Sequence, residues 1–176
     1  ISALFNAIAP HYDLLNRLLS VGFDLLWRRK AVRLLGPVEG KECLDAAAGT
    51  GELSLFLARN GARVTGIDIS EGMLSRAKKK AVRGRSFSDT RFLVQNCESL
   101  RFPEGYFDAA VIGFGIRNMS SPETALAELF RVLRPGGTIV VLEFSRPRCR
   151  VIRALFDFYF VRLLPVFGRI VSGHQS

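Results

Sequence analysis

Short apolar runs alternate with helix-patterned segments from residue 41 to residue 145, and this alternation constrains the fold more than any other feature. The apolar runs lie at 42–47, 63–69, 91–95, 107–114 and 138–144. Helices are predicted at 51–60, 70–83, 121–133 and 147–164, with Ser70 as an N-cap and Pro122 in a first helical turn. Strands that alternate with helices form βαβ units, so we predict an α/β fold with a Rossmann-like, doubly wound, mostly parallel sheet.

A helical region precedes this alternation. Residues 1–35 carry apolar side chains at helical spacing. Gly36 and Pro37 end that region, because Gly supplies a left-handed helix cap and Pro cannot continue a helix. The 176 residues suit a single domain with a substantial core.

Net charge and cysteine content limit the binding partners and the cellular location expected for the chain. The formal net charge of +9 predicts attraction to anionic surfaces, either phospholipid or nucleic acid. The cysteines Cys43, Cys97 and Cys149 have no paired spacing, so neither a disulfide framework nor a metal site is predicted. No signal peptide is recognised, and no apolar run approaches the roughly 18 residues that span a bilayer. We therefore expect an intracellular protein, soluble or peripherally bound to a membrane, and located in an organelle if the source is eukaryotic.

The turn after the first strand is rich in small residues. Two glycines and three alanines stand in Leu44–Glu52, where a ligand could approach the backbone and the free N–H groups of a helix N-terminus. A tight turn without a ligand is the alternative. Ser54 replaces the third small residue of a dinucleotide fingerprint, which modestly weakens a dehydrogenase interpretation. Predicted cofactor contacts here are Asp45, Ala47, Gly49, Thr50 and Gly51.

Asp45 suits a cationic or amine-bearing ligand reached through water, or else is an ordinary strand-end acid. Asp68 ends the second run, where a carboxylate can accept both hydrogen bonds of a ribose diol. That feature is shared with NAD enzymes, and a helix-capping Asp is the alternative. The polar turn 96–98 could read an adenine edge, or could be a plain loop. Predicted cofactor contacts from these two strand ends are Asp68, Ile69, Met73, Asn96, Cys97 and Glu98, although Met73 is also consistent with the core.

These turns resemble the ordered motifs of class I S-adenosylmethionine-dependent methyltransferases, together with the strand 107–114 and the segment 133–137. Three stretches are more specific: 12–16 with Ser20 and Trp27, then 113–118, then 131–145. They resemble the ubiquinone/menaquinone biosynthesis C-methyltransferases, a family that includes demethylmenaquinone methyltransferases. The resemblance covers nearly the whole chain.

The resemblance implies S-adenosylmethionine as the methyl donor, S-adenosylhomocysteine as the product and a ring carbon of a prenylated, demethylated quinol as the acceptor. It places Gly113 at the donor, and Arg117, Asn118 and Tyr12 in catalytic roles. Arg117 would stabilise a phenolate because its guanidinium stays protonated. Peripheral contact with a membrane is compatible with this resemblance, as is assembly into a homodimer or a biosynthetic complex. A nucleic-acid partner is not expected.

The chain departs from the family at Leu15, Asp24 and Gly113, where Met, His and a small hydroxyl residue are common. Family members also continue into about two more edge strands, so we expect the intact protein to extend beyond Ser176. We divide the single domain into a helical N-terminal cap at 1–36, a cofactor-binding core at 41–145 and a helical segment at 146–176. The basic, aromatic stretch 151–171 either docks on a bilayer surface or packs in the core.

Two other functions share this fold. An RNA, protein or other small-molecule methyltransferase would explain the positive charge, although no RNA-binding module accompanies the domain. A non-catalytic adenosine-binding module would need the donor site without an acceptor pocket.

Overall fold

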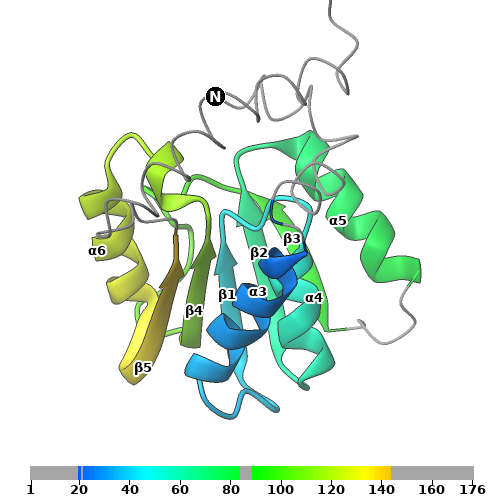
Figure 1. Ribbon diagram of the computed structural model, residues 1–176. Coiled ribbons are helices and arrows are strands. Elements are labelled where there is room, and N and C mark those ends of the chain that lie inside the picture. The colour runs from blue at the N-terminus through cyan, green and yellow to red at the C-terminus, as the bar shows by residue number, and fades with distance from the viewer. Residues whose placement is uncertain (1–19, 21, 84–88, 144–176) are drawn as a thin grey trace, which may run out of the picture.

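The computed structural model describes residues 20, 22–83 and 89–143, and these form one sheet with helices on both faces (Figure 1). All neighbouring strands are parallel, in the order β3-β2-β1-β4-β5. The predicted Rossmann-like α/β fold is therefore confirmed. The strands are β1 (Glu42–Ala46), β2 (Arg63–Asp68), β3 (Thr90–Val94), β4 (Phe107–Gly113) and β5 (Leu133–Leu142).

Helices cover the sheet unequally. On one face, α3 (Phe23–Leu34), α4 (Glu52–Arg59) and α5 (Glu71–Arg83) pack against the strands, and α3 and α4 lie in front of the sheet in Figure 1. On the other face, α6 (Pro122–Val132) buries Ala125, Leu129 and Val132 against β1 and β4. Because both faces are covered, the central strands β1 and β4 are buried along most of their length.

The helix starts follow the predicted capping chemistry. The Ser70 hydroxyl accepts a hydrogen bond from the Met73 N–H at 3.2 Å at the start of α5. Pro122 begins α6, and the Ser121 side chain caps it by accepting from the Thr124 N–H at 3.3 Å. The predicted helix 147–164 and the N-terminal residues 1–19 lie outside the described residues.

Close packing between α4, α5 and β2 depends on two glycines. A Cβ at Gly66 would stand 2.7 Å from the Phe92 ring and 2.9 Å from the Ser54 hydroxyl. Gly51 has φ of +81°, and a Cβ there would stand 2.8 Å from Ala77. The missing side chains let α4 start directly over the ends of β1 and β2, which brings its N-terminus to the site described next.

Candidate cofactor site

A cavity of about 370 Å³ lies at the carboxyl ends of β1, β2, β3 and β4. The strand order reverses there, since β1 lies between β2 and β4, and open α/β sheets bind ligands at such a switch point. Its size falls within the roughly 300–1,000 Å³ of small-molecule sites. Most of the predicted cofactor residues line the cavity, namely Ala47, Gly49, Asp68, Ile69, Met73, Asn96, Cys97, Glu98 and Gly113.

Three predicted contacts do not line the cavity: Asp45, Thr50 and Gly51. Four lining residues were not predicted: Phe114, Gly115, Met119 and Ser120. Phe114 and Gly115 belong to the family-like segment 113–118, so their position directly after β4 was an available signal. Met119 and Ser120 follow a 3₁₀ helix, Ile116–Asn118, which the apolar pattern does not reveal.

The turn after β1 is shaped to leave room for a ligand. Ala47, Gly49 and Gly51 all have positive φ, at 59°, 55° and 81°. A Cβ added to Gly49 would meet no protein atom within 4 Å. A Cβ at Gly115 would stand only 2.5 Å from that of Ala47, so the two turns lie against each other. The small residues thus keep a backbone-walled space open beside the N-terminus of α4.

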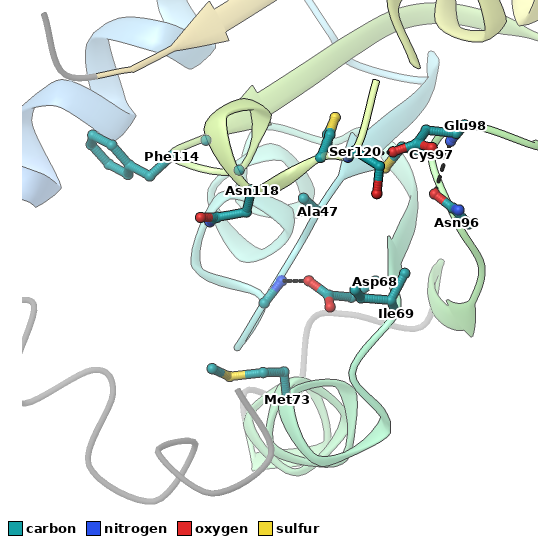
Figure 2. Close-up of a pocket in the computed structure, with 14 residues that line it drawn as sticks. Ala47, Asp68, Ile69, Met73, Asn96, Cys97, Glu98, Phe114, Asn118 and Ser120 are labelled. Carbon is teal, nitrogen blue, oxygen red and sulfur yellow. Dashed lines mark hydrogen bonds between the residues drawn. The ribbon is translucent and has the colours of Figure 1, made fainter. Parts of the chain in front are cut away.

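Asp68 joins two of the strand ends that border the cavity. Its Oδ2 accepts the Gly49 N–H at 2.8 Å and its Oδ1 accepts the Ser70 N–H at 2.9 Å, as Figure 2 shows for the first bond. Burial raises the pKa of this carboxyl, while the backbone N–H donors, led by that of Ser70, oppose the rise. Each carboxylate oxygen can accept a further hydrogen bond, so Asp68 has the capacity to hold a vicinal diol as well.

Asp45 is buried under the turn, with a relative exposure of 1%. Its Oδ2 accepts the Ser54 hydroxyl at 2.6 Å, whereas its Oδ1 has no hydrogen-bond partner among the described residues. Burial raises the pKa of Asp45 to about 6, and the Ser54 hydrogen bond and the charge of Arg28 only partly oppose this rise. The carboxylate therefore supplies negative charge below the cavity rather than at its surface, and its predicted contact through water stays a prediction.

The raised pKa of Asp45 makes the stability of the ligand-free protein depend on pH. Stability contributed by a protonated Asp45 is complete below the unfolded pKa of about 4 and is lost as the pH rises through about 6. We expect Asp45→Asn to raise the free energy of unfolding by about 2 kcal/mol at pH 8, with the gain shrinking towards pH 5. Urea unfolding across this pH range measures it, with Asp89→Asn at an exposed position as the control. A gain that does not vary with pH would contradict this role of the buried charge.

The loop after β3 forms another wall. The Asn96 Oδ1 accepts the Glu98 N–H at 3.0 Å, which folds residues 96–98 into a compact turn (Figure 2). The Glu98 Oε1 accepts the N–H groups of Ser120 and Ser121 at 2.7 and 3.1 Å. Burial raises the pKa of the Cys97 thiol to about 12, so this thiol is neutral near pH 7.

α3 contacts Phe114, which lines the cavity, through two of its side chains. The rings of Trp27 and Phe114 meet edge to face with centroids 6.4 Å apart, and the Arg28 guanidinium lies 5.4 Å from the Phe114 centroid. Asp24 is buried, accepts the Ser20 hydroxyl at 2.8 Å and lies 3.7 Å from the Arg28 Nε. Asp24, at a position where the family that the chain resembles often has His, thus forms an ion pair within α3, with Arg28 one turn later.

The predicted catalytic residues differ in their position relative to the cavity. Asn118 lines the cavity. Arg117 does not; its side chain is 52% exposed and forms an ion pair with Glu143 at 3.2 Å, just after β5. Tyr12 lies outside the described residues. At Gly113, an added Cβ would overlap the Leu53 side chain, so the absence of the family's hydroxyl is matched by close packing of Leu53.

The described part of the chain offers neither a metal site nor a membrane-spanning helix. Among residues 20, 22–83 and 89–143, no group of three or more His, Cys, Asp or Glu side chains is arranged to hold a metal ion. In the same residues, no helix is both long and apolar enough to cross a membrane.

Comparison with known proteins identifies the family. A model of the ubiE/COQ5 methyltransferase family matches residues 1–176. The chain is 43% identical over 172 residues to the ubiquinone/menaquinone biosynthesis C-methyltransferase UbiE of Geobacter sulfurreducens, covering 96% of this chain and 67% of that protein. It is 48% identical over 174 residues to the demethylmenaquinone methyltransferase of Thermus thermophilus, covering 97% and 78%.

Solved structures share the fold. A putative S-adenosyl-L-methionine-dependent methyltransferase from Methanococcus maripaludis aligns with a TM-score of 0.70 at 19% identity, covering 92% of this chain and 73% of that one. A methyltransferase from Thermotoga maritima described as a possible histamine N-methyltransferase aligns with a TM-score of 0.64 at 26% identity, covering 80% and 60%. Since the family model matches residues 1–176, this chain belongs to the ubiE/COQ5 methyltransferase family.

Proposed function

We propose that this protein transfers a methyl group from S-adenosylmethionine, bound in the cavity, to a ring carbon of a demethylated prenylquinol. The observation that carries the proposal is the convergence of four strand ends on one cavity around Asp68, in a chain whose relatives are named for quinone-ring methylation. The alternative of RNA methylation is not favoured by those relatives. The family membership confirms the methyltransferase class predicted from the sequence.

The residues present fit the donor. The open space at Gly49 and the positive φ angles of its turn suit the amino-acid portion of the donor, and the carboxylate of Asp68 suits the ribose diol. The turn 96–98 suits the adenine edge, beside Ile69 and Met73. S-adenosylmethionine supplies a methyl group on a strongly electrophilic sulfonium and leaves as S-adenosylhomocysteine. The buried charge of Asp45 stabilises the cationic donor from beneath the turn.

The acceptor must be held against the donor and made nucleophilic. A phenol ring carbon becomes a good nucleophile when the neighbouring hydroxyl loses its proton. Arg117 cannot take that proton because its guanidinium stays protonated. Its permanent charge instead stabilises the phenolate, while water accepts the hydroxyl proton. The ion pair with Glu143 fixes Arg117 beside Asn118, which lines the cavity and orients the hydroxyl. Tyr12 covers the donor in this proposal.

A prenylated acceptor resides in a membrane, so the enzyme must meet it at the lipid surface. The formal net charge of +9 favours contact with anionic lipids. Peripheral membrane contact is therefore part of the proposal, as is assembly into a homodimer or a biosynthetic complex.

Incubation of the full chain with methyl-labelled donor tests this function. We expect label in a demethylated prenylnaphthoquinol or prenylbenzoquinol, and none in the same quinol already methylated at that ring carbon, which is the matched control. Bulk RNA serves as the competing acceptor. Label in RNA, or donor binding without label in any quinol, would overturn the proposal.

A further inference from the structure

Glu98 connects the loop after β3 to the loop before α6 through hydrogen bonds. Both loops border the cavity, because Glu98 and Ser120 line it, and Figure 2 shows these two residues side by side. One carboxylate oxygen, Oε1, accepts the N–H groups of Ser120 at 2.7 Å and Ser121 at 3.1 Å. The carboxylate is therefore engaged by backbone donors of the opposite wall.

These two donors are groups that need an acceptor. Ser121 is the N-cap of α6 and Ser120 precedes it, so neither N–H has an intrahelical partner. A carboxylate at a helix N-terminus gains from the helix dipole and from charge-assisted hydrogen bonds. The Asn96 Oδ1 holds the Glu98 N–H at 3.0 Å, which fixes the backbone from which this side chain extends.

A second contact holds the same loop to α6 away from the cavity. The Glu128 Oε2 accepts the Leu100 N–H at 2.8 Å, and Arg131 donates to the carbonyl oxygens of Leu100 and Phe102, both at 2.9 Å. This contact holds the body of the loop on α6, whereas the hydrogen bonds that join the two loops at the cavity rim are those accepted by Glu98.

We propose that Glu98 is a positioning residue that closes the rim between residues 96–98 and 118–121 and thereby sets affinity for the donor. It acts through the two loops, without contact with the reacting methyl group. The inference rests on the proposed function for the identity of the ligand, S-adenosylmethionine, whereas the rim contact itself exists in the ligand-free protein.

Four variants of the full chain test the role. Glu98→Ala removes both hydrogen bonds, and Glu98→Asp keeps the charge but shortens the reach by one methylene. Glu98→Gln keeps an oxygen that can accept from both N–H groups. Glu123→Ala removes an exposed carboxylate from the first turn of the same helix and is the matched control.

We expect the donor Kd, measured by calorimetry, and the donor KM to rise about tenfold in Glu98→Ala and Glu98→Asp, with kcat at saturating donor within about twofold of wild type. Glu98→Gln should stay within about threefold of wild type in Kd, and Glu123→Ala should match wild type. In the ligand-free protein, hydrogen exchange at the Ser120 and Ser121 amides should accelerate in the Ala and Asp variants only.

Unchanged donor affinity in Glu98→Ala, unchanged amide exchange, or a loss in kcat at saturating donor would each overturn the inference and leave the proposed function intact. Failure of the wild-type chain to bind S-adenosylmethionine would instead overturn the proposed function, and the inference with it. If Glu98→Ala does not fold, the Asp and Gln variants give the same comparison, because they differ in reach and retain a polar group.

Discussion

Replacing Asp68 by alanine is expected to weaken binding of S-adenosylmethionine about 100-fold. The substitution removes the carboxylate that accepts the Gly49 N–H at 2.8 Å and the Ser70 N–H at 2.9 Å. Both backbone donors, at the edge of the cavity, then lose this acceptor. It also removes the carboxylate proposed to hold the ribose diol. A hydrogen bond to a charged group contributes about 1.5–3 kcal/mol, and a 100-fold loss corresponds to about 2.7 kcal/mol. Titration calorimetry with the donor, and separately with S-adenosylhomocysteine, measures the change.

Asp68→Asn is the matched control for charge and shape. Its side-chain oxygen can still accept one of the two N–H groups, so the expected loss in donor affinity is intermediate, about tenfold. Because product and donor share the ribose, both ligands should lose affinity equally. A loss confined to the donor would assign Asp68 to the sulfonium rather than to the ribose.

Much of the donor side of the site could be predicted because it depends on local sequence. Small residues after a strand and an acid at the next strand end place Gly49 and Asp68 at one edge of any parallel sheet, whatever the rest of the chain does. The same reasoning located the polar turn at Asn96. The sheet itself follows from apolar runs of strand length separated by helical segments.

The orientation of Asp45 could not be read in the same way. Side chains alternate across a strand, and Leu44 and Ala46 face α6, so Asp45 faces the side where α4 begins. That direction places its carboxylate against the Ser54 hydroxyl at 2.6 Å instead of in the cavity. Ser54, which by sequence is a replacement for the third small residue of a dinucleotide fingerprint, is the hydrogen-bond partner of the buried acid.

The acceptor side depends on contacts between distant segments. Arg117 is paired with Glu143, which follows β5, and no local pattern specifies this pairing. The start of β5 shows the same limit: the apolar run begins at 138, but the strand begins at Leu133, which pairs with Phe107 before the register shifts. Met119 and Ser120 reach the cavity only because a 3₁₀ helix follows β4.

Replacing Arg117 by alanine is expected to lower turnover by 100- to 1,000-fold, the magnitude typical for loss of one group that stabilises a developing oxyanion, roughly 10²–10³ in kcat. Donor affinity should stay within about threefold of wild type, since Arg117 does not line the cavity. Single-turnover experiments with labelled donor and saturating quinol measure the methyl-transfer step directly. This division of roles, with Asp68 governing donor affinity and Arg117 governing the chemical step, follows from their positions at the end of β2 and after β4.

The ion pair with Glu143 provides a graded comparison for the same step. Glu143→Gln keeps an oxygen near the Arg117 guanidinium but removes the charge that fixes it, so turnover should fall only about tenfold while donor affinity is unchanged. Arg117→Lys should fall between the Ala variant and wild type, because an ammonium retains the charge without the planar fork. If Arg117→Ala and Asp68→Ala lost donor affinity equally, or if Arg117→Ala turned over as fast as wild type, the guanidinium would not be the group that stabilises the phenolate.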